Sequence, residues 1–421
     1  MTATRARPFG QNYAWVVAAA TFACLLAAAG LRAAPGVLMQ PLHDAFGWPR
    51  SDISAAAAVG FLLYGLVGPF AAALMQTVGI RRTLIAGLLI MSVSTAASLL
   101  MRETWQYLLT WGLCSGLGSG MVASVLGAAV VNRWFVSNRG LVMGLLSAST
   151  ATGSLLFLPV MAALADHGGW RMVVGAVSLT CAALVPVAAL LFVERPSDIG
   201  VWPYGAAQPP PAATPARAAD SLRLAFGALQ RASRTSTFWL LGGAFFVCGL
   251  TTNGLVATHL ISFCGDMGMP IVQAAGLLAV MGVFDLLGTT ASGWLTDRYD
   301  PRKLLFIYYG LRGLSLIALP FSRFDAVSLS AFAVFYGLDW IATVPPTVRL
   351  ANEAFGDREA PIVFGWVLMG HQAGAAVAAY GAGWSRELTG AYLDAFVAAG
   401  VTGLCAAVAV LLIRRTAAAQ A

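Results

Sequence analysis

Long uninterrupted apolar stretches are the feature that most constrains what this chain can fold into. From Tyr13 to Leu31 there is no charged residue, and stretches of similar length recur towards the C-terminus. A helix needs about 20 mostly apolar residues to cross the hydrocarbon core of a bilayer. Hydrophobic residues make up 59% of the 421 residues and charged residues only 10%, against about a quarter in soluble domains. The chain is therefore predicted to be an all-α polytopic membrane protein.

The apolar stretches number twelve and fall into two sets of six. The predicted spans of the first set are 13–39, 51–75, 83–101, 106–131, 140–164 and 171–193. Those of the second set are 237–262, 271–293, 304–322, 327–348, 361–383 and 391–413. A Pro/Ala-rich segment with four arginines near its end separates the sets. We predict an N-terminal six-helix bundle over 1–194, a cytosolic linker over 195–236 and a C-terminal six-helix bundle over 237–421.

The basic residues predict the orientation in the membrane. With the N-terminus inside, eighteen of the 25 Lys and Arg fall in inner segments and five in outer loops, while Arg32 and Arg312 lie within spans. Inner loops of membrane proteins carry this excess of basic residues. The nineteen apolar residues from Tyr13 are too many for a signal peptide, so they predict a retained first helix. A single lysine among 25 basic residues indicates a high-GC bacterial genome. The predicted location is the bacterial cytoplasmic (inner) membrane, multi-pass, with both termini cytosolic.

The two halves repeat weakly in sequence. A shift of 221 residues places "GWPRSDISAA" (47–56) on "GMPIVQAAGL" (268–277) and "RRTL" (81–84) on "RKLL" (302–305). Glycine, proline and the basic pair coincide at opposite ends of one helix. Internal repeats of this kind are typical of transporters, in which the substrate site lies near the midplane between the halves.

One loop carries a family resemblance. The stretch "GWLTDRYDPRK" (293–303) resembles the loop between the second and third helices of each half in the major facilitator superfamily. Its candidate residues are Gly293, Asp297, Arg298 and Arg302, which the resemblance implies act in conformational change. The N-terminal copy, "ALMQTVGIRR" (73–82), has Gln76 and Thr77 where the acid and the arginine would be.

Three further stretches narrow the resemblance. "PGVLMQPLHDAFGWPRSDIS" (35–54), "NRWFVSNRGLVMG" (132–144) and "RPSDIGVWPYG" (195–205) are similar to the monocarboxylate transporter and oxalate–formate antiporter group. The resemblance implies the major facilitator fold, with twelve helices in two bundles. It also implies a secondary active transporter of small organic anions, working by alternating access and often coupled to protons.

The resemblance also implies roles for individual residues. Monocarboxylate carriers tend to have a cation in the first helix, and Arg32 lies at or next to that position. They tend to have an Asp in the eighth helix with an Arg one turn later, where this chain has Asp285 and Thr289. Oxalate carriers place basic residues in helices eight and eleven, where this chain offers only His371. A small monocarboxylate or related organic anion is therefore expected rather than a dianion.

Charges inside the hydrocarbon cost roughly 2.5–3.5 kcal/mol each on insertion scales, so each charged residue there requires an explanation. We predict that Arg32 clamps the carboxylate of the substrate, because its planar guanidinium fits a carboxylate and stays charged. The alternative is that Arg32 reaches the outer headgroups along its own helix. In the repeat register Asn253 corresponds to Arg32, and Tyr64 to Asp285. Arg32, Asn253, Tyr64 and His371 form the predicted substrate-binding set.

Three groups are candidates for the proton. Asp285 is the first choice, because a carboxylate in a low-dielectric site readily takes up a proton. Asp339 and His371 are the alternatives, and a purely structural role for Asp285 also stays open. Arg312, in the ninth helix, is predicted to form a structural ion pair with Asp339 or Asp285, with direct substrate contact as the alternative.

No motif in the chain indicates an enzyme. The sequence has no P-loop, no His/Cys pattern with metal-ligand spacing and no evident nucleophile–base pair. We expect no cofactor, no metal, no nucleic acid and no obligate protein partner, and as partners a small organic acid, H⁺ and the lipid bilayer. Two other functions stay open: an exporter of amphipathic compounds, and a membrane sensor that binds a solute without moving it. The linker shows no pattern of an output domain, which counts against the sensor.

Overall fold

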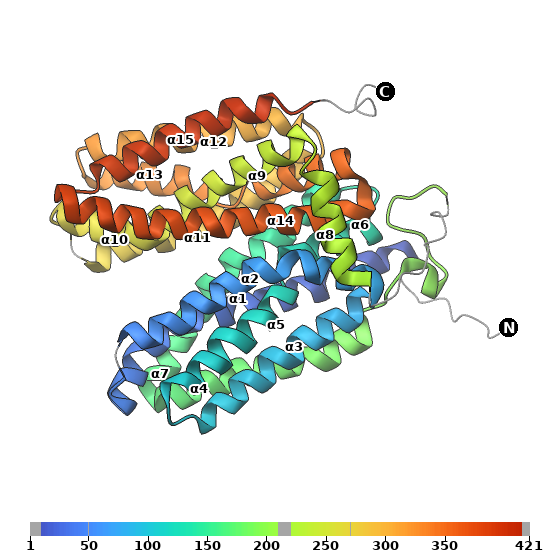
Figure 1. Ribbon diagram of the computed structural model, residues 1–421, viewed down its shortest axis with the longest axis horizontal. Coiled ribbons are helices and arrows are strands. Elements are labelled where there is room, and N and C mark those ends of the chain that lie inside the picture. The colour runs from blue at the N-terminus through green and yellow to red at the C-terminus, as the bar shows by residue number, and fades with distance from the viewer. Residues whose placement is uncertain (1–9, 49, 209–219, 270, 415–421) are drawn as a thin grey trace. The chain divides into compact units, whose positions relative to one another are not determined.

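The computed structural model describes residues 10–48, 50–208, 220–269 and 271–414, apart from fifteen side chains inside these ranges (40, 50, 51, 54, 150–152, 154–156, 158, 271, 272, 275 and 387). Within them the chain is helical almost throughout (Figure 1). Residues 209–219 of the predicted linker and both chain ends lie outside the described residues. The chain forms two compact units, Met1–Gly227 and Ala228–Ala421.

The first unit contains the first six spans. Its main helices are α1 (Tyr13–Phe46), α2 (Arg50–Thr77), α3 (Ile80–Ala97) and α7 (Arg139–Leu191). The fourth span is built from consecutive pieces: α4 (Thr104–Tyr107), a π-helical segment η3 (Leu108–Cys114), α5 (Ser115–Met121) and α6 (Ser124–Trp134). Long α7 holds two spans, because Gly169 has a non-helical backbone with φ 66° that kinks the chain. Within the unit, α1 packs on α7, α2 on α5 and α3 on α7.

The second unit contains the other six spans. Its seventh span runs through α9 (Ser236–Gly249), a π-helical segment η6 (Leu250–Val256) and α10 (Ala257–Asp266). The remaining helices are α11 (Ile271–Thr296), α12 (Pro301–Ala318), α13 (Ala326–Asp339), α14 (Val344–Thr389) and α15 (Leu393–Leu411). Gly356, with φ 72°, divides α14 as Gly169 divides α7. Here α12 packs on α15, α9 on α14 and α11 on α13.

The predicted fold class is confirmed. Ten helices among the described residues are long and apolar enough to cross a membrane. Dividing the stretch Ala326–Arg386 at Gly356 gives one more span, and the part of α7 before Gly169 gives another. The described residues therefore form twelve membrane-spanning helices, the number that the apolar stretches predicted.

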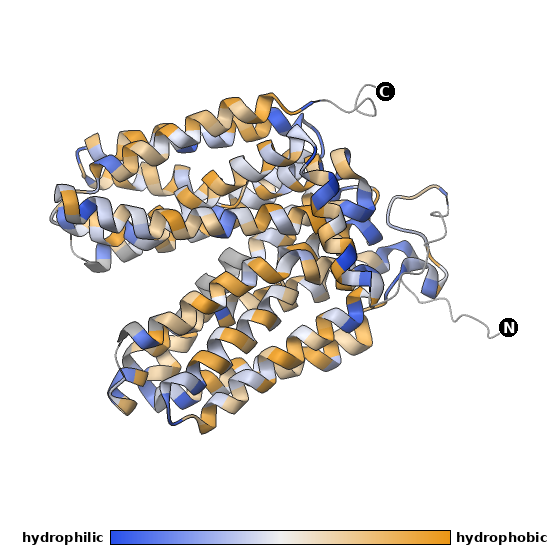
Figure 2. Cartoon of the chain, in the orientation of Figure 1, coloured by the Kyte–Doolittle hydropathy of each residue, from blue (hydrophilic) through white to orange (hydrophobic). Residues whose placement is uncertain are grey.

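The surface of each unit is apolar where a soluble protein would be polar. Large side chains such as Leu62, Leu179 and Tyr380 are 65–77% exposed. In Figure 2 hydrophobic residues run along the helices, whereas hydrophilic residues concentrate near their ends. Helices in lipid satisfy their own backbone groups and turn apolar side chains outwards, so this surface is that of a polytopic membrane protein.

The first helix is longer than the sequence predicted. The apolar stretch predicted residues 13–39, but α1 continues to Phe46 and ends at Gly47, which adopts a left-handed conformation with φ 69°. The Gly47 amide donates to the carbonyl of His43 (2.8 Å) and closes the helix. The length of an apolar stretch predicts only the part of a helix that lies in hydrocarbon, so it does not predict that the helix continues into a more polar segment. Arg32 consequently lies well inside α1 and not near its end.

Two glycines bring α9 and α14 into backbone contact. A Cβ atom on Gly249 would lie 1.8 Å from the carbonyl oxygen of His371, and one on Gly374 would lie 2.0 Å from that of Phe246. Only glycine tolerates such approach, which is a common packing device between membrane helices. This contact fixes the position of His371 against the seventh span.

Candidate functional site

The tenth span is broken in its middle. Helix α13 ends at Asp339, residues 340–343 form turns, and α14 begins at Val344. Pro345 and Pro346 follow at once, and because proline has no N–H they cannot bond the carbonyls of Ile341 and Ala342. The break therefore leaves backbone groups that must find other partners inside the membrane.

Arg312 of α12 binds the upstream side of this break. Its side chain is completely buried, and its Nε donates to Asp339 Oδ2 at 2.6 Å. Its Nη2 donates to the carbonyl of Asp339 and to that of Trp340, the latter at 3.1 Å. One guanidinium thus neutralises a carboxylate and caps two carbonyls at the end of α13. Of the two partners that the sequence offered for Arg312, the structure places Asp339 in contact.

Asp285 and Ser292 of α11 bind the downstream side of the break. Asp285 is 2% exposed, and its Oδ1 accepts from the Ile341 amide (3.0 Å) and from Thr289 Oγ1 (2.6 Å). Ser292 Oγ donates to the carbonyl of Ala342 (2.6 Å), which Pro346 cannot reach. The broken helix is therefore held by side chains from the two preceding spans. Thr289, at the position where the sequence resemblance implied an arginine, donates its hydroxyl hydrogen to Asp285.

The charges of this cluster do not balance. It contains one guanidinium, Arg312, and two carboxylates, Asp285 and Asp339, and among the described residues no second base forms an ion pair with either carboxylate. With all three groups ionised the cluster carries a net charge of −1, which is costly in a low-dielectric interior. Uptake of one proton by either carboxylate removes that excess. The cluster is therefore suited to bind a single proton.

Cys248 is a member of the cluster that the sequence did not reveal. Arg312 Nη1 lies 3.1 Å from its Sγ and 3.4 Å from Thr251 Oγ1, and Thr343 Oγ1 lies 3.3 Å from the same sulfur. Cys248 lies in an apolar stretch of the sequence, where nothing marks it as the partner of a charged group. Only the fold brings it to the guanidinium, 64 residues further along the chain.

Two of the predicted substrate-binding residues meet in the second unit. Asn253, exposed on the π-helical segment η6, has its Nδ2 3.4 Å from His371 Nε2 on α14. The His371 ring also lies 5.1 Å from the ring of Phe245, centroid to centroid. The pair presents an amide and an imidazole on the membrane-spanning part of this unit.

The other two meet in the first unit. The guanidinium carbon of Arg32 lies 4.3 Å above the ring centroid of Tyr64 on α2. Within the span Gly10–Met39, Arg32 lies about 11 Å from the centre, inside the roughly 15 Å half-thickness of the hydrocarbon. No carboxylate lies within ion-pair distance of Arg32 among the described residues, and the ring stabilises the charge by only about 0.5–2 kcal/mol. Arg32 is thus half-buried and free to bind an anion.

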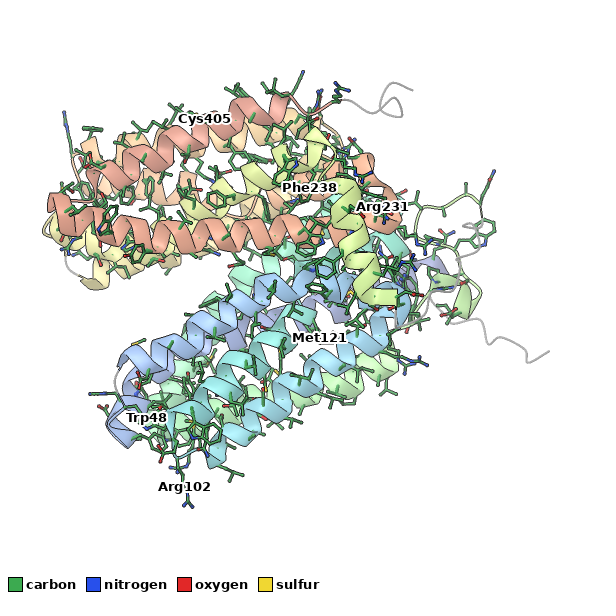
Figure 3. All side chains as sticks on the ribbon, in the orientation of Figure 1. Trp48, Arg102, Met121, Arg231, Phe238 and Cys405 are labelled. Atoms are coloured by element: carbon green, nitrogen blue, oxygen red, sulfur yellow. The ribbon has the colours of Figure 1, made fainter. Side chains whose placement is uncertain are left out.

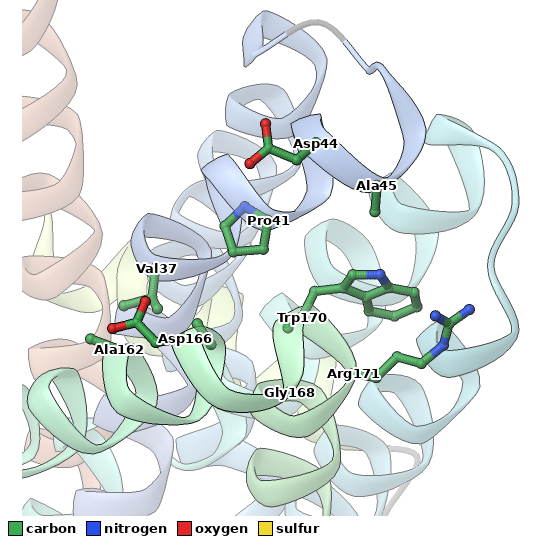
Figure 4. Close-up of a pocket in the computed structure, with 11 residues that line it drawn as sticks. Val37, Pro41, Asp44, Ala45, Ala162, Asp166, Gly168, Trp170 and Arg171 are labelled. Carbon is green, nitrogen blue, oxygen red and sulfur yellow. The ribbon is translucent and has the colours of Figure 1, made fainter.

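A separate cavity lies at one end of the first unit. It has a volume of about 780 Å³ and lies between the last turns of α1 and the kink of α7. Figure 4 shows Trp170 and Arg171 on one side, and Asp44 and Asp166 on the walls. The predicted site residues are not among those that line it. Among the described residues no three His, Cys, Asp or Glu side chains gather as metal ligands would.

Comparison with known proteins identifies the family. A family model described as Major Facilitator Superfamily matches residues 21–379. The chain belongs to the major facilitator superfamily. It is similar to monocarboxylate transporter 13 of Bos taurus (27% identity, covering 94% of this chain and 88% of the relative) and to monocarboxylate transporter 11 of Mus musculus (31% identity, covering 76% and 68%). The solved structure of the human organic anion transporter MFSD10 shares the fold, with a TM-score of 0.72 at 17% identity over 94% of this chain and 99% of that one.

The major facilitator loop of the second unit is a compact ionic turn. Asp300 accepts from the amide of Arg302 (3.0 Å) and pairs with its guanidinium (2.6 Å), and Arg302 Nη1 reaches the carbonyl of Ile413 (3.1 Å). The loop thereby ties the start of α12 to the end of α15. Upstream, the Asp297 amide donates to the carbonyl of Gly293 (3.3 Å). Arg298 stacks 4.0 Å above the ring of Trp294.

The degenerate major facilitator loop of the first unit obtains its acid from elsewhere. The Glu194 carboxylate accepts from the amides of Ile80 (2.8 Å) and Arg81 (3.0 Å), and it pairs with Arg133 at the end of α6. An acid at a helix N-terminus satisfies otherwise unpaired amides and the helix dipole. Glu194, at the end of the sixth span, therefore does for α3 what Asp300 does for α12. The signal in the sequence was the absence of any capping residue before Ile80, where Gly79 stands.

Two of the stretches that carried the family resemblance pair with each other. The Tyr204 amide donates to the carbonyl of Trp134 (2.8 Å), and the Val136 amide donates to the carbonyl of Tyr204 (2.9 Å). The rings of Trp15, Phe135 and Tyr204 pack together, with centroids 5.4–5.9 Å apart. The loop after the fourth span is thus fastened to the start of the predicted linker.

Proposed function

We propose that this major facilitator protein is a secondary active transporter that carries a small organic monocarboxylate together with a proton, by alternating access. The observation that carries the proposal is the state of Arg32. It is a guanidinium within the hydrocarbon span that faces Tyr64 and has no carboxylate within ion-pair distance among the described residues. A charge within a membrane span that the protein leaves unneutralised is suited to a substrate of opposite charge.

In this proposal the carboxylate of the substrate binds the Arg32 guanidinium. The fork of an arginine binds a carboxylate through two parallel hydrogen bonds. The Asn253–His371 pair supplies further hydrogen-bonding groups, and Tyr64 holds Arg32 in place. One guanidinium in this set favours a monocarboxylate over a dianion. The names of the monocarboxylate transporter relatives are in keeping with this substrate class.

Coupling to a proton is proposed to occur at the broken tenth span. Asp285 is the group proposed to take up the proton, because its Oδ1 accepts a hydrogen bond from the Ile341 amide within the break. Protonation weakens that charge-assisted hydrogen bond and leaves the Arg312–Asp339 pair electrically neutral. The break is the element whose geometry would respond, since its backbone groups depend on Arg312, Asp285 and Ser292.

The proposed location is a bacterial cytoplasmic membrane, with both termini in the cytosol. The supporting observation is the distribution of basic residues, which concentrates in the segments that this orientation places inside. The proposed domain organisation keeps two six-helix bundles joined by a linker over 195–236.

Transport by purified protein in proteoliposomes tests the proposal. We expect uptake of a radiolabelled small monocarboxylate, accumulated against its gradient when the outside is acidic and the inside alkaline. Collapse of the pH gradient with an uncoupler should leave only equilibration. Movement of amphipathic cations instead of acids would identify an exporter, and binding without transport would identify a sensor; either result would overturn the proposal.

A further inference from the structure

A short helix within the predicted linker presents an unusual surface. Helix α8 (Ser221–Ala232) belongs to none of the candidate spans among the described residues. Its alanines Ala225, Ala228 and Ala232 are buried, whereas Leu222 and Phe226 are 62% and 54% exposed. In a water-facing helix the large apolar residues would be the buried ones. The exposed stripe therefore requires an apolar environment outside the protein.

The positions of these residues define three faces of α8. Leu222, Phe226 and Leu229 follow one another at i, i+4 and i+7, so they lie within about 60° of each other around the helix. We call these three residues the α8 stripe. The buried alanines flank it on one side, and Arg223 flanks it on the other. From Ser221 to Ser236 the chain has three arginines and no acidic residue.

Contacts within the first unit set the depth of the stripe. Ser221 Oγ lies 2.6 Å from Thr77 Oγ1, at the last residue of α2. The Phe226 ring lies 5.5 Å from that of Phe70, centroid to centroid. Phe70 precedes the end of this membrane span by seven residues, about 10 Å along the helix. Phe226 is therefore level with the last turns of a helix that crosses the bilayer.

The residues after α8 also mark a membrane boundary. Helix α9 begins at Ser236, four residues beyond α8, and is the start of the seventh span. Trp239 in its first turn is exposed and donates its indole Nε1 to the carbonyl of Ser233 (2.8 Å). Tryptophans concentrate at the interface between lipid and water. The segment from α8 into α9 thus follows the interface before it enters the hydrocarbon.

We infer that α8 is a membrane-surface helix that inserts the α8 stripe into the boundary between headgroups and acyl chains of an anionic leaflet. The partner is lipid, because the stripe lies level with a spanning helix and because the charged side chains of α8 itself, Arg223 and Arg231, are both basic. Arg223 and Arg234, both exposed, are placed to bind lipid phosphates, whereas Arg231 is already paired with Glu359 (2.8 Å). Amphipathic helices with this combination of an apolar face and basic residues bind anionic membrane surfaces. The inference does not depend on the identity of the substrate.

Fluorescence quenching by lipid tests the inference in the full chain. Cys114 and Cys405, the two cysteines that are not buried, are replaced by serine, and Leu222→Cys or Gln230→Cys is labelled with an environment-sensitive dye. The protein is reconstituted in phosphatidylcholine vesicles with phosphatidylglycerol, with and without lipid that carries a spin label near the headgroup. We expect the dye at position 222 to emit at shorter wavelength and to be quenched by spin-labelled lipid. The dye at 230, on the polar face, should show neither effect.

The outcomes separate lipid from water and from protein partners. Unquenched, long-wavelength emission at position 222, equal to that at 230, would mean that the stripe faces water and would overturn the inference. A second outcome is that the dye at position 222 is not quenched in vesicles but emits at short wavelength in native membranes. This result would mean that another protein covers the stripe, and it would also overturn the inference. Arg223→Gln should reduce the quenching at 222 in vesicles with phosphatidylglycerol and not in phosphatidylcholine alone. Arg102→Gln, an exposed arginine far from α8 in the chain, is the matched control.

Discussion

Arg312 binds Asp339 twice, through the carboxylate at 2.6 Å and through the backbone carbonyl of the same residue. The side-chain contact neutralises a charge, and the backbone contact caps a helix that ends inside the membrane. Arg312 is therefore tied to the local structure of the break, and a substrate would have to displace both contacts to reach it. This geometry favours a structural role for Arg312 over direct substrate contact.

Loss of Arg312 should destabilise the protein strongly. Arg312→Ala leaves the Asp339 carboxylate buried and uncompensated, which costs about 3–5 kcal/mol. Thermal unfolding in detergent, followed by tryptophan fluorescence, should show a clearly lower midpoint. Arg102→Ala, at an arginine whose side chain extends away from the protein (Figure 3), should leave the midpoint unchanged.

A paired substitution separates the two contacts. In Arg312→Met with Asp339→Asn both members of the ion pair lose their charge, so the excess charge of the cluster is no larger than in the unchanged protein and stability should recover in large part. If the double variant unfolds at as low a temperature as Arg312→Ala, then the two hydrogen bonds from Arg312 to backbone carbonyls contribute more stability than its ion pair with Asp339. An unfolding midpoint of Arg312→Ala equal to that of the unchanged protein would contradict both contributions.

Asp285→Asn should uncouple transport from the proton. The side-chain oxygen of the asparagine can still accept hydrogen bonds from Ile341 and Thr289, so the fold should persist. The asparagine side chain, however, takes up no proton. Accumulation driven by a pH gradient should be lost, while exchange of labelled for unlabelled substrate stays at least partly intact. Asp394→Asn, at an exposed acid in the first turn of α15, is the control. Normal accumulation by Asp285→Asn would place the proton elsewhere, with Asp339 and His371 as the next variants.

Arg32 should control affinity for the organic acid. Arg32→Gln removes the charge that we assign to the carboxylate, so binding measured by ligand-induced thermal shift should fall severely without loss of expression. Arg32→Lys keeps the charge but not the planar fork, and it should retain part of the affinity. An arginine that merely reached the headgroups would tolerate glutamine, so unchanged affinity in Arg32→Gln refutes the clamp.

Glu194 should stabilise the first unit. Glu194→Ala removes the cap of α3 and leaves Arg133 without its acid, and we expect a loss of about 1–3 kcal/mol. Glu194→Gln keeps one acceptor oxygen and should cost less. Asp166→Ala, at an exposed acid of the same unit, should have little effect on the unfolding midpoint. Equal stability of the alanine and unchanged proteins would mean that the cap contributes nothing.

Cysteine accessibility should reveal the orientation. Gln230→Cys in α8 should react with an impermeant reagent only from the cytosolic side, and Glu103→Cys, in the loop before α4, only from outside. The reverse pattern would invert the proposed topology. Reaction of both from one side would contradict the number of spans between them.

The spans could be predicted because apolar length is a local property of the sequence. Their ends could not, as α1 shows, since the seven residues beyond Met39 stay helical outside the apolar stretch. The break in the tenth span could be predicted from Pro345 and Pro346, because the missing amides are a property of those residues alone.

The partners of buried charges were harder to predict. The sequence left both Asp339 and Asp285 open as partners of Arg312, and only the packing of α11, α12 and α13 shows that Asp339 is the one in contact. The roles of Cys248 and Glu194 were not predicted, because their contacts join residues that lie 61 to 114 positions apart in the sequence. A single sequence carries no signal for such pairs beyond a missing cap.

The cap on α3 also has a consequence for biosynthesis. Ile80 is translated 114 residues before Glu194, which at about 5–20 residues per second is an interval of roughly 6–23 s. During that time the third helix enters the bilayer with two amides at its start that lack their acceptor. The cap at the start of α3 can therefore form only after the sixth helix and Glu194 have been synthesised.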